Sequence, residues 1–442
     1  MKKSKNWRNF YKGWDIAMSE NVKLPDGWQK VKLSEIIEEV KERNITNNKE
    51  YPILTSSRKG IYIQEEYFNR VVASENLSNY KIIRKNEFTY RSMSDDQTFV
   101  FNRLELLEVG LVSPAYYVFK AKNSLSTFIK YFLNNSQEIK SQISKVIEGT
   151  TRTALRFNQV LKFVAMVPPL PEQRKIAEIL ETIDNAIEKT DAIIEKYKRI
   201  KQGLMQDLLT KGIDENDNIR DEKTHKFKDS PLGRIPEEWE VVRLMEVVSS
   251  YAGGTPNRDI DEFYNGNIKW LKSGEISKKY ISDTEEKITE KGLKFSNAKY
   301  IAVNAVVIAL YGATAGQVGI VKDILTANQA VLALNILDKL RLFHEYLYYF
   351  LSKFIPMILS QLQGSGQPNL SKNIVDNTFI SLPPLPEQQR IASILSQTDQ
   401  VIEKEQAYKE KLERIKKGLI EDLLTGKVRV NHLIEEEDKD GN

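Results

Sequence analysis

The sequence contains no cysteine and only three histidines, His225, His344 and His432, in 442 residues. A chain without cysteine has no disulfide, no thiolate nucleophile and no cysteine-based zinc site. Three histidines scattered along the sequence are also a poor basis for a metal site. We therefore expect no metal centre and no cofactor in this chain.

Long hydrophobic runs are also missing. No apolar stretch approaches the roughly 18 residues that a membrane-spanning helix needs, and the first twenty residues contain basic side chains without the apolar segment of a signal peptide. We expect a cytoplasmic protein with no membrane partner.

Neither sign of charge dominates. The chain has 65 Lys and Arg against 61 Asp and Glu, a net charge of +4 and a pI near 8.7. This balance permits nucleic-acid binding without requiring it. Because dense Lys/Arg runs are absent, a DNA partner would have to be recognised by shape and base contacts as well as by phosphate neutralisation. The length predicts two or three domains.

What the sequence does contain is a long internal repeat. "PPLPEQRKIAEIL" begins at Pro168 and "PPLPEQQRIASIL" begins at Pro383, and the two copies align without gaps as far as Thr210 and Thr425, with identical residues at more than half of the positions. Proline and then glutamate suit the first turn of a helix. A duplication of this length predicts two copies of one structural element.

Both copies carry apolar residues at alternating steps of three and four, as in a coiled-coil seam. Each helix would be roughly 60 Å long at about 1.5 Å per residue, and the simplest partner for one is the other, although ordinary amphipathic core helices stay an alternative. The same residues are candidates for binding helices of a partner protein. The seam consists of Ile176, Leu180, Ile183, Ile187, Ile194, Tyr197, Leu204 and Leu208, interrupted at Thr190 and Lys201, and of Ile391, Leu395, Ile402, Leu412, Leu419 and Leu423, widened by Ile394, Val401, Tyr408 and Ile415.

Both copies contain a glycine inside the helical pattern and another just after it. Gly212 and Gly426 follow the helices and suit C-terminal caps. Gly203 and Gly418 lie inside the helical pattern, where we interpret them as marks of a close helix crossing.

A globular domain precedes each helix. "LPDGWQKVKL" (residues 24–33) and "IPEEWEVVRL" (residues 235–244) share a tryptophan followed by alternating apolar residues, which predicts an opening strand packed by its tryptophan. Apolar and β-branched runs broken by Gly, Asn and Ser predict a mixed α/β (α+β) fold for both domains. The polar segment between the halves reads as a surface linker.

This arrangement resembles the specificity subunit of type I restriction-modification systems. The repeated proline-led helix carries the resemblance, together with "HKFKDSPLGRIPEEWEVVRL", "WLKSGEI", "YGATAGQVGIV" and "LLTGKVRV". The resemblance implies two target-recognition domains in a pseudo-twofold repeat, each reading one half of a bipartite DNA sequence, separated by two long antiparallel coiled-coil helices that set the unread spacer. The predicted boundaries are 1–166 and 235–381 for the domains, 167–212 and 382–430 for the helices, 213–234 for the linker and 431–442 for a polar tail.

The resemblance also implies the partners. Double-stranded DNA, two methyltransferase subunits and restriction (motor-nuclease) subunits would assemble with a chain that is not itself an enzyme. The partner subunits would bring S-adenosylmethionine, ATP and Mg²⁺, and the target adenine would be flipped into the methyltransferase.

Candidate DNA contacts lie in loops that combine hydroxyl, amide and basic side chains. The first domain lacks a clear counterpart of "WLKSGEI" and "YGATAGQVGIV", so its contacts are chosen from its own loops. The candidates are Arg91, Ser92, Thr150, Thr151, Arg152 and Arg156 in the first domain and Lys272, Ser273, Tyr311, Thr314, Gln317, Gln367, Asn369 and Lys372 in the second.

Two other classes of function stay open at this point. The glycines Gly312, Gly316 and Gly319 do not have the spacing of a phosphate-binding loop and suit a β-turn better. Asp26 with Glu39 and Lys41 is only a weak match to a nuclease site. A self-contained nuclease and a bivalent protein adaptor without DNA specificity are the two alternatives.

Overall fold

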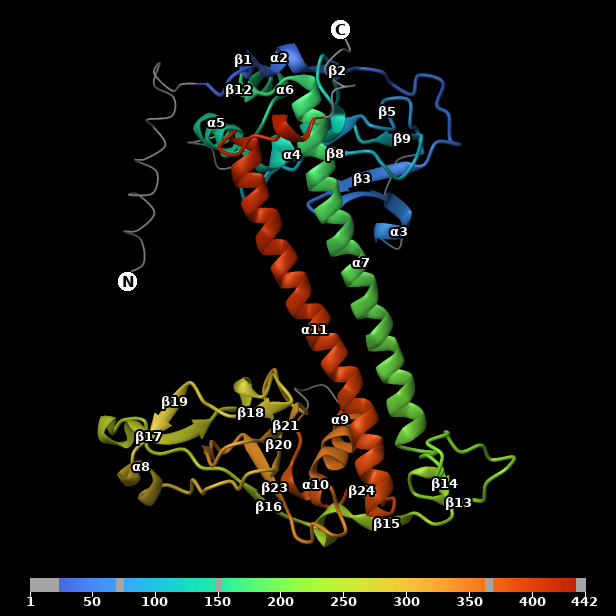
Figure 1. The fold of residues 1–442 in the computed structure, drawn as a ribbon, viewed down its shortest axis with the longest axis vertical. Helices are drawn as coiled ribbons and strands as arrows, with labels where there is room; N and C mark the ends of the chain where they lie inside the picture. Colours follow the sequence, from blue (N-terminus) through green and yellow to red (C-terminus); the bar gives the residue numbers. More distant parts are fainter. Residues whose placement is uncertain (1–23, 69–74, 148–152, 362–368, 435–442) are drawn as a thin grey trace. The chain divides into compact units, whose positions relative to one another are not determined.

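The computed structural model describes residues 24–68, 75–147, 153–361 and 369–434. The chain forms two compact units, unit 1 (residues 1–190 with 408–442) and unit 2 (residues 191–407). The division falls inside both long helices, α7 (Leu170–Leu208) and α11 (Leu385–Leu424), of 39 and 40 residues. Each unit therefore holds one globular domain, the beginning of the helix that leaves it, and the end of the other helix (Figure 1).

Unit 1 contains two four-stranded sheets. Strand β1 pairs with the closing strand β12, and the short strands β7 and β11 pair with each other. The described residues of this domain also form five short helices and one 3-10 turn. The first sheet has the order β2 (Ile37–Val40), β10 (Tyr116–Ala121), β6 (Phe88–Arg91) and β8 (Asn102–Arg103), and the second β4 (Gly60–Ile63), β3 (Ile53–Ser57), β9 (Val109–Val112) and β5 (Lys81–Arg84). The other elements are β1 (Gln29–Lys32), β7 (Met93–Ser94), β11 (Thr153–Ala154), β12 (Val164–Val167), α2 (Leu33–Ile36), α3 (Gln64–Phe68), α4 (Ser126–Asn135), α5 (Gln137–Ile147), α6 (Phe157–Val160) and a 3-10 turn at Asn431–Leu433.

Unit 2 is built around a five-stranded sheet. Its opening strand β15 pairs with the closing strand β24, as β1 does with β12. The sheet has the order β16 (Val248–Ala252), β23 (Val331–Ile336), β20 (Val306–Ala309), β21 (Val318–Val321) and β18 (Tyr280–Ile281), and a smaller sheet holds β19 (Glu286–Ile288), β17 (Tyr264–Leu271) and β22 (Thr326–Ala327). The other elements are β13 (Phe227–Ser230), β14 (Gly233–Pro236), β15 (Glu240–Arg243), β24 (Phe379–Leu382), α8 (Glu290–Lys294), α9 (His344–Gln361), α10 (Lys372–Asp376) and 3-10 turns at Leu244–Glu246, Asp261–Phe263 and Ser273–Glu275.

The two units share a central sheet although their sequences diverge. Strands β2, β10, β6 and β8 in unit 1 follow the same antiparallel order as β16, β23, β20 and β21 in unit 2. In both units an opening strand runs into a short helical turn, and its tryptophan, Trp28 or Trp239, is buried. The prediction of a mixed α/β domain opened by a tryptophan-packed strand is confirmed.

The long helices pack against the domains and against each other within each unit. In unit 1, Ile176 and Leu180 of α7 share a core cluster with Leu423 of α11. In unit 2, Leu208 of α7 shares a core cluster with Leu395 of α11. The beginning of one helix thus lies beside the end of the other, as an antiparallel pair requires.

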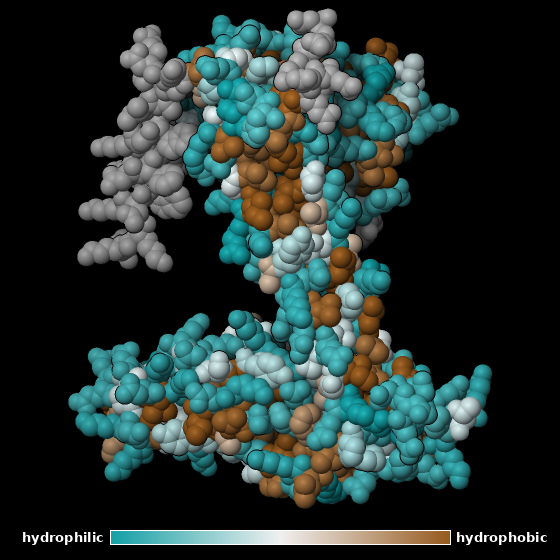
Figure 2. Space-filling model, viewed as in Figure 1, coloured by the Kyte–Doolittle hydropathy of each residue, from teal (hydrophilic) through white to brown (hydrophobic). Residues whose placement is uncertain are grey.

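The predicted seam is buried or half-buried along both helices, but its width was predicted wrongly. Tyr408 and Ile415 are 50% and 42% exposed. The seam of α11 passes instead through the half-buried Lys409 and Lys416, one residue further on, and one residue turns a helix by about 100°. Hydrophobic side chains are visible on the surface of the helical region (Figure 2).

The interior glycines were also interpreted wrongly. Among the described residues, no atom outside their own helix lies within 4 Å of a Cβ placed on Gly203 or Gly418. Both glycines are exposed, so they mark no close helix crossing.

The segment predicted as a linker, residues 213–234, is more ordered than its polarity suggested. Ile213 is fully buried, and β13 pairs with β14 in a hairpin that extends past the predicted boundary to Pro236. Elsewhere the strands end close to the predicted limits, with β12 ending at Val167 and β24 at Leu382. Within the described ranges, no helix combines the length and apolar character that crossing a membrane requires.

Candidate nucleic-acid interface

Three segments of unit 2 bring most of its predicted DNA-contact residues close together. The Thr314 hydroxyl donates to the backbone carbonyl of Ser273 at 3.1 Å, which joins the turn after β17 to the turn after β20. The backbone N–H of Leu370 donates to the Leu310 carbonyl at 2.8 Å, which places the segment with Asn369 beside the segment with Tyr311. The three segments together form the unit 2 edge, residues 272–275, 310–317 and 369–372.

The turn between β20 and β21 is held by its glycines. Gly312 and Gly316 have φ values of +90° and +84°, which a glycine adopts without strain. A Cβ on Gly316 would lie 2.4 Å from a methyl carbon of Leu359, so the turn approaches α9 closely. The β-turn prediction is confirmed, and the exposed Tyr311 and Gln317 flank the turn.

The two lysines of this edge are already paired with carboxylates. Lys272 Nζ lies 3.1 Å from Glu285 and 3.2 Å from Glu286, and the hydrogen bond to Glu285 raises the pKa of Lys272. Lys372 pairs with Asp376 one turn along α10. To contact a phosphate, either lysine would have to leave its carboxylate partner. These ion pairs were not predicted from the sequence.

Unit 1 brings its described candidates together in the corresponding place. Ser92 follows β6, its hydroxyl donates to the Ala115 carbonyl at 2.8 Å, and its own carbonyl accepts the backbone N–H of Leu155 at 2.9 Å. Arg156 is exposed and comes directly after Leu155. The unit 1 edge is therefore residues 91–94 with 153–156. The remaining candidates, Thr150, Thr151, Arg152 and Gln367, lie outside the described residues.

A small polar pocket opens beside the unit 1 edge. It has a volume of about 150 Å³ and is lined by Arg91, by Ser94 and by Arg58, among others. Arg58 lies 2.6 Å from Asp96. Sequence reasoning missed Arg58, because it lies in a hairpin far from the other candidates and belongs to no recognisable motif.

The two edges are equivalent in the fold. Strand β6 has the position of β20 in the central sheet, and Leu155 and Leu370 each donate a backbone N–H to the residue that follows that strand. A short helix, α6 or α10, comes next in both units. The structure thus shows that the unit 1 edge and the unit 2 edge are equivalent, which the diverged sequences did not reveal.

The repeated "PPLPEQ" segment positions two buried polar side chains in each unit. In unit 1, Trp28 Nε1 donates to Glu172 at 3.0 Å, and Arg429 Nε and Nη2 donate to the same carboxylate at 2.7 and 2.9 Å. In unit 2, Trp239 Nε1 donates to Glu387 at 3.2 Å, and Arg220 Nη2 does so at 3.1 Å. Both glutamates are buried.

The glutamine after each glutamate ties the helix to its domain. Gln173 accepts the backbone N–H of Leu125 at 3.0 Å, at the start of α4, and Gln388 accepts that of Phe343 at 2.9 Å, at the start of α9. Each side chain also donates to the carbonyl of the first proline of its motif. The glutamates were predicted only as helix-start residues, and neither the role of the glutamines nor the arginine partners of the glutamates were predicted.

Both predicted capping glycines lie close to this glutamate–tryptophan contact. Gly212 and Gly426 have φ values of +65° and +69°. A Cβ on Gly212 would lie 2.2 Å from the Glu387 carboxylate, and one on Gly426 would lie 2.7 Å from Cγ of Pro25 and 3.2 Å from the ring of Trp28. The chain passes too close to the buried glutamate in unit 2, and to Pro25 beside the tryptophan in unit 1, for a residue with a Cβ.

Comparisons with known proteins agree on one family. A family model described as the type I restriction modification DNA specificity domain matches the chain twice, over residues 25–198 and 236–414. The type I restriction enzyme MjaVIII specificity subunit of Methanocaldococcus jannaschii is 29% identical over 441 residues, which cover 96% of this chain and 98% of that protein. The EcoR124I/EcoR124II specificity subunit of Escherichia coli is 28% identical over 192 residues, 41% of this chain and 46% of that protein.

Solved structures show the same fold. The S subunit of a type I restriction-modification system from M. genitalium matches with a TM-score of 0.56 and 14% identity over 92% of this chain and 97% of that one. A chain solved in work on assembly and conformational transition of the type I R-M system matches with a TM-score of 0.54 and 20% identity, over 92% of this chain and all of that one.

Proposed function

Because the chain belongs to the type I restriction modification DNA specificity family and carries two copies of its domain, we propose that unit 1 and unit 2 each read one half of a bipartite DNA sequence. The chain is a DNA-recognition subunit of this family and not an enzyme. The alternatives of a self-contained nuclease and of an adaptor without DNA specificity are not supported.

The observation that carries this proposal is the pairing of a common joint with different edges. The joint between each domain and the helices contains a buried glutamate that accepts hydrogen bonds from a tryptophan and an arginine. The edges lie at the same place in the central sheet but carry different side chains, Arg91 and Ser92 in one unit and Tyr311 and Thr314 in the other. Two modules of one fold with different polar edges suit the reading of two different half-sites.

Base contacts rather than phosphate contacts would supply the specificity of the unit 2 edge. Its lysines are matched by carboxylates, whereas Tyr311, Gln317 and Asn369 are exposed. Amide side chains suit hydrogen bonds to adenine, and hydroxyls can pair with either donors or acceptors on the bases. Indirect readout of DNA that is bent or opened for methylation would add to this.

Partner docking belongs to a different face from the buried seam. Ile193 and Ile200 on α7 are each 39% exposed, and Tyr408 and Ile415 hold the same positions in the second copy. Residues seven apart lie on one face of a helix. We propose that one methyltransferase subunit binds each of these two stripes, whereas the seam pairs α7 with α11.

Restriction subunits would then join the complex. The partner subunits would bring S-adenosylmethionine, ATP and Mg²⁺, and the complex would act in the cytoplasm.

The reading function is tested by co-expressing the chain with its methyltransferase in a host free of adenine methylation. Single-molecule sequencing then maps N6-methyladenine across the host genome. We expect a split motif with a gap of fixed length. New methylation at a continuous motif, or none from a soluble, assembled complex, would contradict the proposal.

The docking stripes are tested by Ile200→Glu, Ile415→Glu and the double variant. A buried carboxylate in an apolar contact is costly, so each single variant should lose one methyltransferase subunit and the double variant both. Light scattering on the purified complex gives the stoichiometry. Gln202→Glu, an exposed change about 200° around α7 from Ile200, is the control, and full assembly of the double variant would place docking elsewhere.

A further inference from the structure

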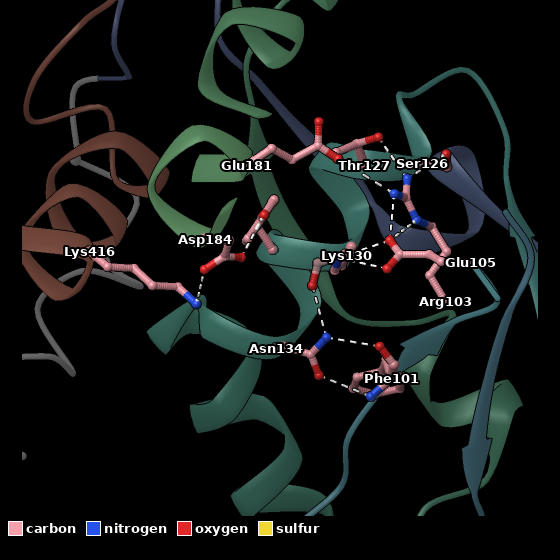
Figure 3. A network of polar contacts seen from close by, with 11 residues as sticks. Phe101, Arg103, Glu105, Ser126, Thr127, Lys130, Asn134, Glu181, Asp184 and Lys416 are labelled. Atoms are coloured by element: carbon pink, nitrogen blue, oxygen red, sulfur yellow. Dashed lines mark hydrogen bonds and ion pairs between the residues drawn. The ribbon is translucent and has the colours of Figure 1, made fainter. Parts of the chain in front are cut away.

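Asp184 of α7 joins three elements of unit 1. Its carboxylate accepts the Tyr131 hydroxyl of α4 at 2.7 Å and lies 2.5 Å from Lys416 Nζ of α11. Figure 3 shows the carboxylate between the lysine of the returning helix and the helix of the domain. Burial, and then the hydrogen bond to Asp184, raise the pKa of Tyr131, so its hydroxyl keeps the proton that it donates.

Unit 2 contains the same triad. Asp399 of α11 accepts the Tyr349 hydroxyl of α9 at 2.6 Å and lies 2.6 Å from Lys201 Nζ of α7. The aspartates occupy matching positions of the repeat, and so do the lysines. The two tyrosines come from domains that differ in sequence, yet each donates its hydroxyl to the aspartate at the same position of the repeat.

A second contact lies one turn before each aspartate. In unit 1, the side chain of Arg103 is only 8% exposed and lies 3.6 Å from Glu181. In unit 2, the side chain of Lys279 is only 6% exposed and donates to the Ser396 hydroxyl at 3.2 Å. Glu181 and Ser396 hold the same place in the repeat. Each domain thus touches its helix at two polar points about one turn apart.

These contacts differ in kind from the apolar packing around them. Burial of apolar surface is not directional, so a domain packed by it alone can rotate at little cost. The hydrogen bonds from the two tyrosines to the aspartates are charge-assisted and therefore directional, and the aspartate–lysine pairs beside them are half-buried. Together with the polar contact one turn earlier, each domain is held at two points of one helix turn, which fix an angle that one point cannot fix.

We propose that the Tyr131–Asp184–Lys416 and Tyr349–Asp399–Lys201 triads are positioning residues that fix each domain's angle about the helix pair and thereby the spacer length that the protein accepts. The inference rests on the proposed reading of a bipartite site. Lengthening the spacer by one base pair moves the second half-site by about 3.4 Å and turns it by roughly 35°. A fixed angle therefore discriminates between spacers.

The test compares spacers in the assembled complex with its methyltransferase. Once the motif is known, binding is measured to duplexes with the preferred spacer and with spacers one base pair shorter and longer. We expect the double variant Asp184→Ala/Asp399→Ala to lose about tenfold of its preference, the size of one charge-assisted hydrogen bond, with binding to the preferred spacer changed less. The control is Glu195→Gln/Glu413→Gln, which changes two exposed glutamates whose ion pairs lie within a single helix each, α7 and α11.

A second variant keeps the inference falsifiable if the aspartate variant does not fold. Tyr131→Phe/Tyr349→Phe retains both rings and both aspartate–lysine pairs and removes only the hydroxyls that tie the domains to them. An unchanged spacer preference in a folded variant overturns the inference while the bipartite motif stands. Failure of the wild-type chain to select any bipartite motif overturns the proposed function instead.

Discussion

Unit 1 and unit 2 are alike at the joint between domain and helices and different at the edge. The joint repeats a buried glutamate, its tryptophan and arginine donors, and an aspartate bridged by tyrosine and lysine. Away from the joint, unit 1 adds a second four-stranded sheet and unit 2 a three-stranded one. Two domains that bind DNA at a fixed separation need the same joint to the helices. Their edges must differ if the two domains recognise different bases.

The largest effect is expected from breaking the joint at its glutamate. Glu387→Ala would remove the acceptor of the Trp239 indole and the buried partner of Arg220, whose guanidinium would keep the more exposed carboxylate of Glu238. Breaking a buried ion pair costs about 3–5 kcal/mol, and the remaining pair puts this variant at the lower end of that range. Glu172→Ala should cost less, because the side chain of Arg429 is 24% exposed and that of Arg220 only 10%. Hydrogen exchange resolved by segment would measure both losses.

The comparison predicts where each loss appears as well as its size. Protection should fall in unit 2 for Glu387→Ala and in unit 1 for Glu172→Ala. Glu387→Gln, which keeps an acceptor but removes the charge, should lie between the wild type and the alanine variant. Equal loss in both units from either variant would show that the joints are not independent.

A smaller effect is expected on the pH dependence of stability, through a buried lysine in unit 2. Burial lowers the pKa of Lys353 on α9 to about 8, whereas an unfolded lysine has a pKa near 10.4. Below pH 8 both states are protonated and the full cost of burying the charge is present. Between pH 8 and 10 the unfolded state binds more protons, so the stability of the folded state rises with pH through this group.

Lys353→Met should therefore raise the melting temperature at pH 7 by about 2 °C. The gain over the wild type should shrink as the pH rises from 8 to 10, in thermal melts of the purified chain. The exposed Lys404 on α11 gives the matched control, Lys404→Met. A gain that does not change with pH would mean that added apolar packing, and not the lysine's charge, is responsible.

The helices and the domain class were predictable because they rest on periodic signals. Alternating steps of three and four along 40 residues predict the seam, and a tryptophan before alternating apolar residues predicts the opening strand. The two arginines of the joint were not predictable, since Arg220 and Arg429 lie in irregular segments and meet their glutamates only through the fold.

The edges were predictable only in part. Ser273 and Thr314 were chosen from separate motifs, and the structure joins those motifs through a hydrogen bond between the two residues. The pairing of Lys272 with two glutamates depends on the register of β17 and β19, which residue type alone does not reveal. Exposure of Tyr408 and Ile415 was missed because an apolar residue on a flank looks like part of the seam.

The most direct measurement of the central claim is to map the methylated motif of two edge variants beside the wild type. Arg91→Ala/Arg156→Ala changes only the unit 1 edge, and Thr314→Ala/Asn369→Ala changes only the unit 2 edge. Each lost base contact is worth about 1–3 kcal/mol, so each variant should relax one half of the split motif and leave the other half and the gap as they were. Relaxation of both halves by one variant, or an unchanged motif in both, would contradict the account of two separate readers.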